Sequence, residues 1–207
     1  MKRLLVLIAT PFLLCHCASI STLQTARVLE KGESQHNVGV GFYTSDDFLG
    51  GEDLTFPMLE YSYRMGVWDK IDAGLKISLI GTAVLDAKYN LVNGENFALA
   101  TGLGLGYLSI DSGPEDAEMT TTIIDVILPL YASYDISKMF GFYSAGKFLF
   151  RSVSADGEVE GDGSMLSATL GIKYGDSSGV MLEGSLLSGL DSDFTGSQFN
   201  FGVFFEI

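Results

Sequence analysis

The stretch from Lys70 to Leu91 alternates apolar and polar residues so regularly that it constrains the fold of the whole chain. A period of two is typical of β-strands, because successive side chains point to opposite faces of a sheet. One face is apolar or small, and the other carries two pairs of opposite charge, Asp72 with Lys76 and Asp86 with Lys88. This pattern favours a membrane barrel with apolar residues toward lipid and polar residues in the lumen, the inverse of a soluble sheet.

Composition narrows the class of protein. The 207 residues include only 18% charged residues, and their mean hydropathy is +0.29. Beyond the amino terminus there is no apolar run of about 18 residues, the length that a transmembrane helix needs, so the hydrophobicity is spread over alternating strands. The net charge of −14 argues against a nucleic-acid partner, since nucleic-acid binding needs a basic surface.

Ten segments of strand length follow the amino-terminal region. They span residues 35–44, 54–66, 70–79, 83–92, 96–109, 121–135, 140–152, 164–174, 179–188 and 197–207. Each suits a tilted membrane strand, which needs about 9–11 residues. We therefore predict an all-β fold, a closed antiparallel up-and-down transmembrane β-barrel of about ten strands, with eight or twelve strands as alternatives.

The predicted connections alternate between short turns and longer loops. The longer ones span residues 45–53, 110–120, 153–163 and 189–196, and only the break at Gly81 is tight on that side. Membrane barrels have short periplasmic turns and longer external loops, so an even strand number with both termini in the periplasm fits this alternation. Pro57 and Pro129 fall inside predicted strands of a barrel that has no free edge, and we expect a β-bulge at each.

The charged residues of the four longer connections are all acids. Clustered carboxylates attract hard cations, and one connection offers a weak candidate cation site, Asp156, Glu158, Glu160 and Asp162. It lacks the spacing of a dedicated metal loop, so a solvated rim of mutually repelling acids is the favoured interpretation. We expect no metal and no other cofactor.

A second set of charges has lumen parity within the strands and contains acids and bases in equal number. Its members are Glu60, Arg64, Asp72, Lys76, Asp86, Lys88, Asp125, Lys147, Arg151, Lys173, Glu183 and Glu206. Because unpaired buried charges are costly, the balance indicates a network of ion pairs and hydrogen bonds between strands. Side chains already fill barrels of about eight strands, so we predict a closed or very narrow bore.

Aromatic residues gather near the predicted strand ends, as in the interfacial girdles of membrane barrels. The chain ends Phe199-Asn200-Phe201-Gly202-Val203-Phe204-Phe205-Glu206-Ile207, which resembles the terminal strand that the barrel-assembly machinery of outer membranes recognises. That strand usually ends in an aromatic residue, whereas this one ends in Ile207. The resemblance implies this machinery as a partner. A membrane barrel also implies outer-membrane lipids as partners, and the acids of the longer connections could interact weakly with lipopolysaccharide through bridging cations.

Residues 1–17 resemble an export signal, with Lys2 and Arg3 before an apolar run. Cys17 lies where bacterial lipoproteins carry the acylated cysteine, although His16 before it departs from their pattern, as Leu14 does before Cys15. The alternative is simple cleavage near Ala18, which would discard both cysteines. Residues 18–34 lack a clear period and are expected to form a periplasmic tether, leaving 35–207 for the barrel. The tether resembles the segment after the acylated cysteine in barrel lipoproteins of Gram-negative bacteria and spirochaetes, which implies a location in the bacterial outer membrane.

Barrel enzymes such as omptin proteases and outer-membrane phospholipases use a histidine in their sites. Outside the signal region this chain has one, His36, at the periplasmic start of the first strand and with lipid-face parity. A general base there could not reach an external substrate, so we expect no catalytic site. The expected function is a non-enzymatic envelope or surface role. A narrow channel for small solutes and a soluble lipocalin-like ligand carrier are alternatives, and the oligomeric state stays open.

Overall fold

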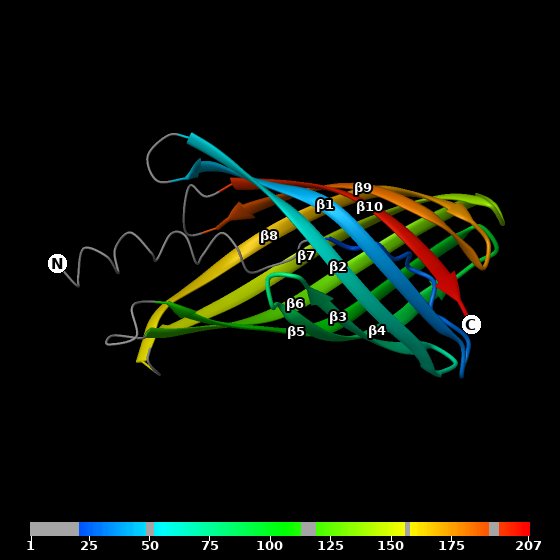
Figure 1. The fold of residues 1–207 in the computed structure, drawn as a ribbon. Coiled ribbons are helices and arrows are strands. Elements are labelled where there is room, and N and C mark those ends of the chain that lie inside the picture. Colours follow the sequence, from blue (N-terminus) through cyan, green and yellow to red (C-terminus); the bar gives the residue numbers. More distant parts are fainter. Residues whose placement is uncertain (1–20, 49–51, 113–118, 156–157, 191–194) are drawn as a thin grey trace.

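Ten antiparallel strands make up most of the computed structural model, which describes residues 21–48, 52–112, 119–155, 158–190 and 195–207. The strands are β1 (Ser34–Phe48), β2 (Glu52–Trp68), β3 (Ile71–Ser78), β4 (Ala83–Asn93), β5 (Phe97–Ser112), β6 (Met119–Ser137), β7 (Phe140–Ala155), β8 (Glu158–Gly175), β9 (Ser178–Gly189) and β10 (Thr195–Glu206). Each strand pairs with its neighbours in sequence, and β1 pairs with β10, which closes the barrel (Figure 1). The predicted closed up-and-down barrel of ten strands is confirmed.

The closing pair of strands is long and regular. Its register runs from Gln35 opposite Glu206 to Ser45 opposite Gly196 without a shift. Closure joins the first strand to the last, so most main-chain groups of the barrel wall find partners within the sheet, as a bilayer interior requires. Among the described residues, no helix has both the length and the apolar character that crossing a bilayer demands.

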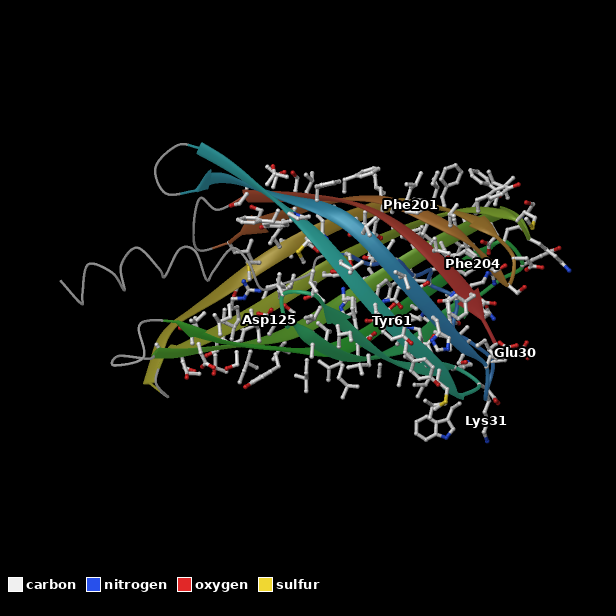
Figure 2. All side chains as sticks on the ribbon, viewed as in Figure 1. Glu30, Lys31, Tyr61, Asp125, Phe201 and Phe204 are labelled. Carbon is white, nitrogen blue, oxygen red and sulfur yellow. The ribbon has the colours of Figure 1, made fainter. Side chains whose placement is uncertain are left out.

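The outer face of the barrel is apolar. Leu75 is 45% exposed and Leu85 is 60% exposed, although both are large hydrophobic side chains. The two faces of β10 show the same inversion, because Phe201 points outward whereas Phe204 is fully buried inside (Figure 2). An exposed apolar belt around a closed barrel fits lipid and not water. The barrel is therefore of the outer-membrane type, and the soluble carrier was the wrong alternative.

Aromatic side chains mark both ends of this belt. Trp68, Tyr134 and Tyr174 are exposed near the four short turns, and Phe42 and Tyr107 are exposed toward the opposite end. The end with the short turns and the C terminus is called the periplasmic end below, and the opposite end is called the external end.

Two details of the predicted strands were wrong. Several strands continue into the residues expected to form long loops, because hairpin pairing satisfies their main-chain groups: β7 reaches Ala155 and β8 begins at Glu158. The expected bulges at Pro57 and Pro129 are absent, since the register is the same on both sides of each proline. At Pro129 the pairing with β5 pauses between Thr101 and Gly104 and resumes unshifted, and the Thr101 hydroxyl donates to the Pro129 carbonyl over 2.9 Å.

The substitution Leu75→Arg tests the outward face. An arginine that faces lipid costs about 2–4 kcal/mol at the bilayer midplane and less toward either interface. We expect the free energy of unfolding from liposomes to fall, by an amount that changes with bilayer thickness.

Lys76→Met is the matched control, because Lys76 is the next residue along β3 and faces the lumen. Its effect should not change with bilayer thickness. A Leu75→Arg penalty that is the same in thin and thick bilayers would contradict the assignment of this face to lipid.

Candidate functional site in the barrel lumen

The segment before β1 lies inside the barrel. Ser21, Thr22, Leu23 and Ala26 are buried, with Ala26 fully enclosed. Figure 1 shows the dark-blue trace of this segment within the strands, running to the periplasmic end where β1 begins. The periplasmic tether expected over residues 18–34 is therefore not what the structure shows for residues 21–29. We call residues 21–29 the lumen segment.

Glu183 of β9 holds the beginning of the lumen segment. Its two carboxylate oxygens accept hydrogen bonds from the main-chain nitrogens of Thr22 and Leu23, both over 2.7 Å. Leu23 has a φ of 40°, and a left-handed residue in a turn can aim successive N–H groups at one anion. The Tyr143 hydroxyl and the Asn200 amide also donate to Glu183, over 3.0 and 2.9 Å, so the carboxylate is fully engaged.

Three lysines bind the carbonyls of the same segment. Lys76 and Lys147 approach from β3 and β7 and donate to the Ser21 carbonyl over 3.0 and 2.8 Å. Lys88 of β4 donates to the carbonyls of Thr25 and Arg27 over 2.9 and 2.7 Å. Hydrogen bonds from a charged donor contribute more than neutral ones, and here they satisfy carbonyl acceptors of a buried or half-buried segment.

Two side chains of the lumen segment fit apolar pockets of the wall. Leu23 packs with Tyr143, Met181 and Phe204, and a Cβ added to Gly39 would lie only 2.5 Å from Leu23 Cδ1. Gly39 therefore makes the room that Leu23 occupies.

The second pocket holds Ala26. It packs with Ala98, Ala100, Tyr131 and Ala145, a cluster in which most members are alanine. Ala26 has no exposed surface, so this pocket excludes a larger side chain at that position.

Arg27 fixes the segment at the periplasmic end. Its Nε lies 2.5 Å from the Asp135 carboxylate, Nη1 donates to the Asn93 amide oxygen over 2.8 Å and Nη2 donates to the Glu95 carbonyl over 2.8 Å. The planar guanidinium thus binds the turn between β4 and β5 and the end of β6 at the same time. Two residues further on, the Leu29 nitrogen donates to Asp72 over 3.3 Å.

The wall carries its own ion pairs between strands. Arg64 of β2 bridges Asp72 and Asp86, and Lys88 lies 3.3 Å from Asp72. Nearer the external end, where Figure 2 labels Asp125, Arg151 is paired with Asp125 through two hydrogen bonds of 2.7 Å. Both side chains are almost completely buried.

The structure places every residue of the predicted lumen set on the inner face, in three groups. Arg64, Asp72, Asp86, Lys88, Asp125 and Arg151 form ion pairs with one another. Glu60, Lys76, Lys147 and Glu183 bind the lumen segment, Glu60 by accepting from the Ser21 hydroxyl. Lys173 and Glu206 lie apart from both groups, near the periplasmic end.

A cavity of about 680 Å³ opens at the periplasmic end beside the lumen segment. Thr25, Arg27 and Leu29 line it together with Lys173 and Glu206 of the wall. The Lys173 ammonium lies 4.8 Å from the centre of the Phe204 ring, and Glu206 accepts from the Gln35 amide over 3.0 Å. We call this cavity the vestibule.

The external half of the lumen contains two apolar clusters beside the Arg151–Asp125 pair, and the sequence did not predict these clusters. Met58, Leu149, Met165 and Leu187 form one buried cluster with Tyr43. Leu108, Ile123 and Val153 form a second cluster. Apolar side chains and the buried Arg151–Asp125 pair together fill this half of the bore.

The other predicted site residues take no part in the lumen. His36 faces outward, stacks on Phe205 with 4.9 Å between ring centres, and lies 2.7 Å from the Tyr61 hydroxyl. Cys15, Cys17 and Asp156 lie outside the described residues, and the side chains of Glu158 and Glu160 are not described either. Asp162 is exposed, and within the described ranges no group of three or more His, Cys, Asp or Glu could hold a metal ion.

Sequence reasoning missed Ser21, Thr22, Leu23, Ala26 and Arg27 as part of the lumen. A segment whose partners are side chains of distant strands has no period of its own. One signal was present: small residues repeat at lumen positions of several strands, namely Gly39, Gly41, Ala98, Ala100, Ala145, Gly171 and Gly202. A wall of small residues leaves space that an inserted chain can fill.

Known structures share the architecture. The outer membrane protease OmpT from Escherichia coli is 12% identical, with a TM-score of 0.50 over 90% of this chain and 100% of that chain. Ail of Yersinia pestis, in complex with the heparin analogue sucrose octasulfate, is 10% identical with a TM-score of 0.46, over 86% and 99% of the two chains. Neisserial surface protein A is 10% identical with a TM-score of 0.44, over 84% and 99%.

At such identities the likeness concerns the fold alone. No protein-family model matches the chain, and no curated protein matches it in sequence. The chain has the fold of bacterial outer-membrane β-barrels.

Glu183→Gln tests the anchor of the lumen segment. The amide keeps the size of the side chain but turns a donor toward main-chain N–H groups that need an acceptor. Hydrogen bonds to a charged group contribute about 1.5–3 kcal/mol, so the amides of Thr22 and Leu23 should exchange with deuterium roughly 10- to 150-fold faster.

Glu206→Gln is the control, because Glu206 lies on the adjacent strand and bonds to Gln35 instead of the lumen segment. Amides of β9 and β10 should stay protected in both variants. Unchanged exchange at Thr22 and Leu23 in Glu183→Gln would mean that Glu183 does not anchor the segment.

Arg151→Met tests the buried pair in the external half. It leaves Asp125 buried without its bidentate partner, and breaking a buried pair from one side costs about 3–5 kcal/mol. Urea unfolding from liposomes should show this loss. The double variant Arg151→Met with Asp125→Leu should recover most of it, and a double variant as unstable as the single one would argue against the pairing.

Proposed function

We propose that this chain is a plugged outer-membrane barrel with a non-enzymatic role in the bacterial envelope, closed to the passage of solutes. The observation that carries the proposal is the lumen segment, which Glu183, Lys76, Lys147 and Lys88 hold inside the bore. A channel would need these charged groups free to meet water and solute. Here they bind the protein's own main chain.

Closure at two levels supports the same proposal. The lumen segment blocks the bore beyond the vestibule, and the cluster of Met58, Leu149, Met165 and Leu187 fills part of the external half. Where residues 21–24 meet the wall, the remaining cavity is about 50 Å³, room for little more than water, and the larger vestibule lies toward the periplasmic end.

The position of His36 favours a non-enzymatic role. It is the one histidine of the described residues, and it lies on the outer face against Phe205 and Tyr61. A base on that face, toward the periplasmic end, is separated by the wall from any substrate in the lumen or at the external surface.

The partners that fit this role are lipids and lipopolysaccharide around the apolar belt. The hairpins at the external end are rich in acids, which could bridge to lipopolysaccharide through divalent cations. Insertion would depend on the barrel-assembly machinery, through a last strand whose outward residues are Phe199, Phe201, Val203 and Phe205.

Planar-bilayer recording tests the closure. The wild-type protein should insert without a steady conductance, whereas the alternative, a narrow channel, would give uniform steps. A shift in gel mobility between boiled and unboiled samples should accompany each recording, because it shows that the inserted protein is a closed barrel. Reproducible unitary conductance from such a sample would overturn the proposal in favour of the channel.

A further inference from the structure

We infer that the lumen is a peptide-binding site, selective for a polypeptide with the pattern Leu-x-x-Ala-Arg that turns at its leucine, and that the lumen segment is its resident, exchangeable occupant. The inference extends the plugged barrel proposed above, because it treats the plug as a bound ligand. The matching residues of this chain are Leu23, Ala26 and Arg27.

Most of the polar contacts recognise main chain, which any peptide offers. Glu183 accepts two consecutive N–H groups, Lys147 binds one carbonyl and Lys88 binds two more. Asn37 adds a bond to the Leu23 carbonyl over 3.2 Å, and Asn90 adds one to the Ala26 carbonyl over 3.4 Å. Main-chain contacts of this kind provide affinity in extended-peptide recognition, and pockets for side chains provide specificity.

Three places in the wall supply that specificity. The Leu23 pocket exists because Gly39 and Gly202 lack side chains, since an added Cβ would lie 2.5 and 3.0 Å from Leu23. The Ala26 pocket admits only a small side chain. The third place takes an arginine, which is held by Asp135 and by the carbonyl of Glu95.

The vestibule gives a peptide access to this site. Thr25, Arg27, Val28 and Leu29 are among the residues that line it, so a cavity of about 680 Å³ borders the bound segment where it leaves the lumen. A competing peptide can begin to bind in the vestibule while part of the lumen segment is still bound to the wall. The ligand class is therefore an unfolded polypeptide on the periplasmic side, with an arginine that meets the acids of this end.

The test uses full-length protein in which only the resident segment is changed. Ala26→Trp cannot enter the alanine pocket, and Leu23→Asp would bury an unpaired carboxylate, so either change should release the segment while the wall stays intact. The probe is a fluorescein-labelled peptide with the sequence of residues 21–31, and its binding is followed by fluorescence anisotropy in detergent micelles.

Both variants should bind the peptide at least about tenfold more tightly than the wild type. In the wild type the tethered segment competes at an effective concentration on the order of millimolar, which suppresses binding of a peptide added at micromolar concentration. A peptide carrying the same Ala26→Trp change, and a scrambled peptide, should bind at least roughly tenfold more weakly. Adding Glu183→Gln to either variant should weaken binding of the wild-type peptide.

Two results would overturn the inference. One is the absence of peptide binding by both released variants in samples whose gel mobility shows a closed barrel. The other is equal binding of the wild-type and scrambled peptides. Neither of these binding results depends on conductance. A barrel that conducts would therefore overturn the proposed closure without deciding whether the lumen binds the peptide.

Discussion

Hydrogen bonding of buried main chain is the constraint on which this structure depends. A chain inside a barrel loses the water that would solvate its N–H and C=O groups, and each group left unpaired costs free energy. Glu183 and the three lysines provide the replacement partners, from strands β9, β3, β4 and β7. Their charges are in turn balanced inside the bore, so the segment and the polar wall stabilise each other.

The size of the barrel explains why a segment is needed. Side chains alone fill a bore of about eight strands, and ten strands enclose more space. Small wall residues such as Gly39, Ala98 and Ala145 enlarge the space further, and Leu23 and Ala26 occupy it. Ion pairs of Arg64 and Arg151 fill the remaining width between strands. The filled bore and the apolar belt together support an envelope role that does not involve transport.

The sequence predicted the strands of the barrel wall far better than it predicted what fills the lumen. A period of two identified every strand and the inward face of residues such as Asp125 and Lys147, because alternation is a local consequence of the pleat. The lumen segment was not predicted because its contacts are with residues distant in the sequence. Thr22 binds Glu183, and Arg27 binds Asp135. The apolar clusters of the external half were not predicted either, because Leu149 and Met165 have lumen parity but the lumen was expected to be polar.

The position of the lumen segment in the sequence constrains the order of assembly. The segment immediately precedes β1, and the strand that closes the barrel against β1 is the last one, β10. The same late part of the chain supplies Glu183, Asn200, Gly202 and Phe204, the groups that hold or accommodate Leu23 and its neighbours. The first described residues therefore reach their binding site only when the final strands are in place. The pairing of β1 with β10 and the docking of the lumen segment then occur together. A barrel in which β1 and β10 are not yet paired would have an unoccupied interior.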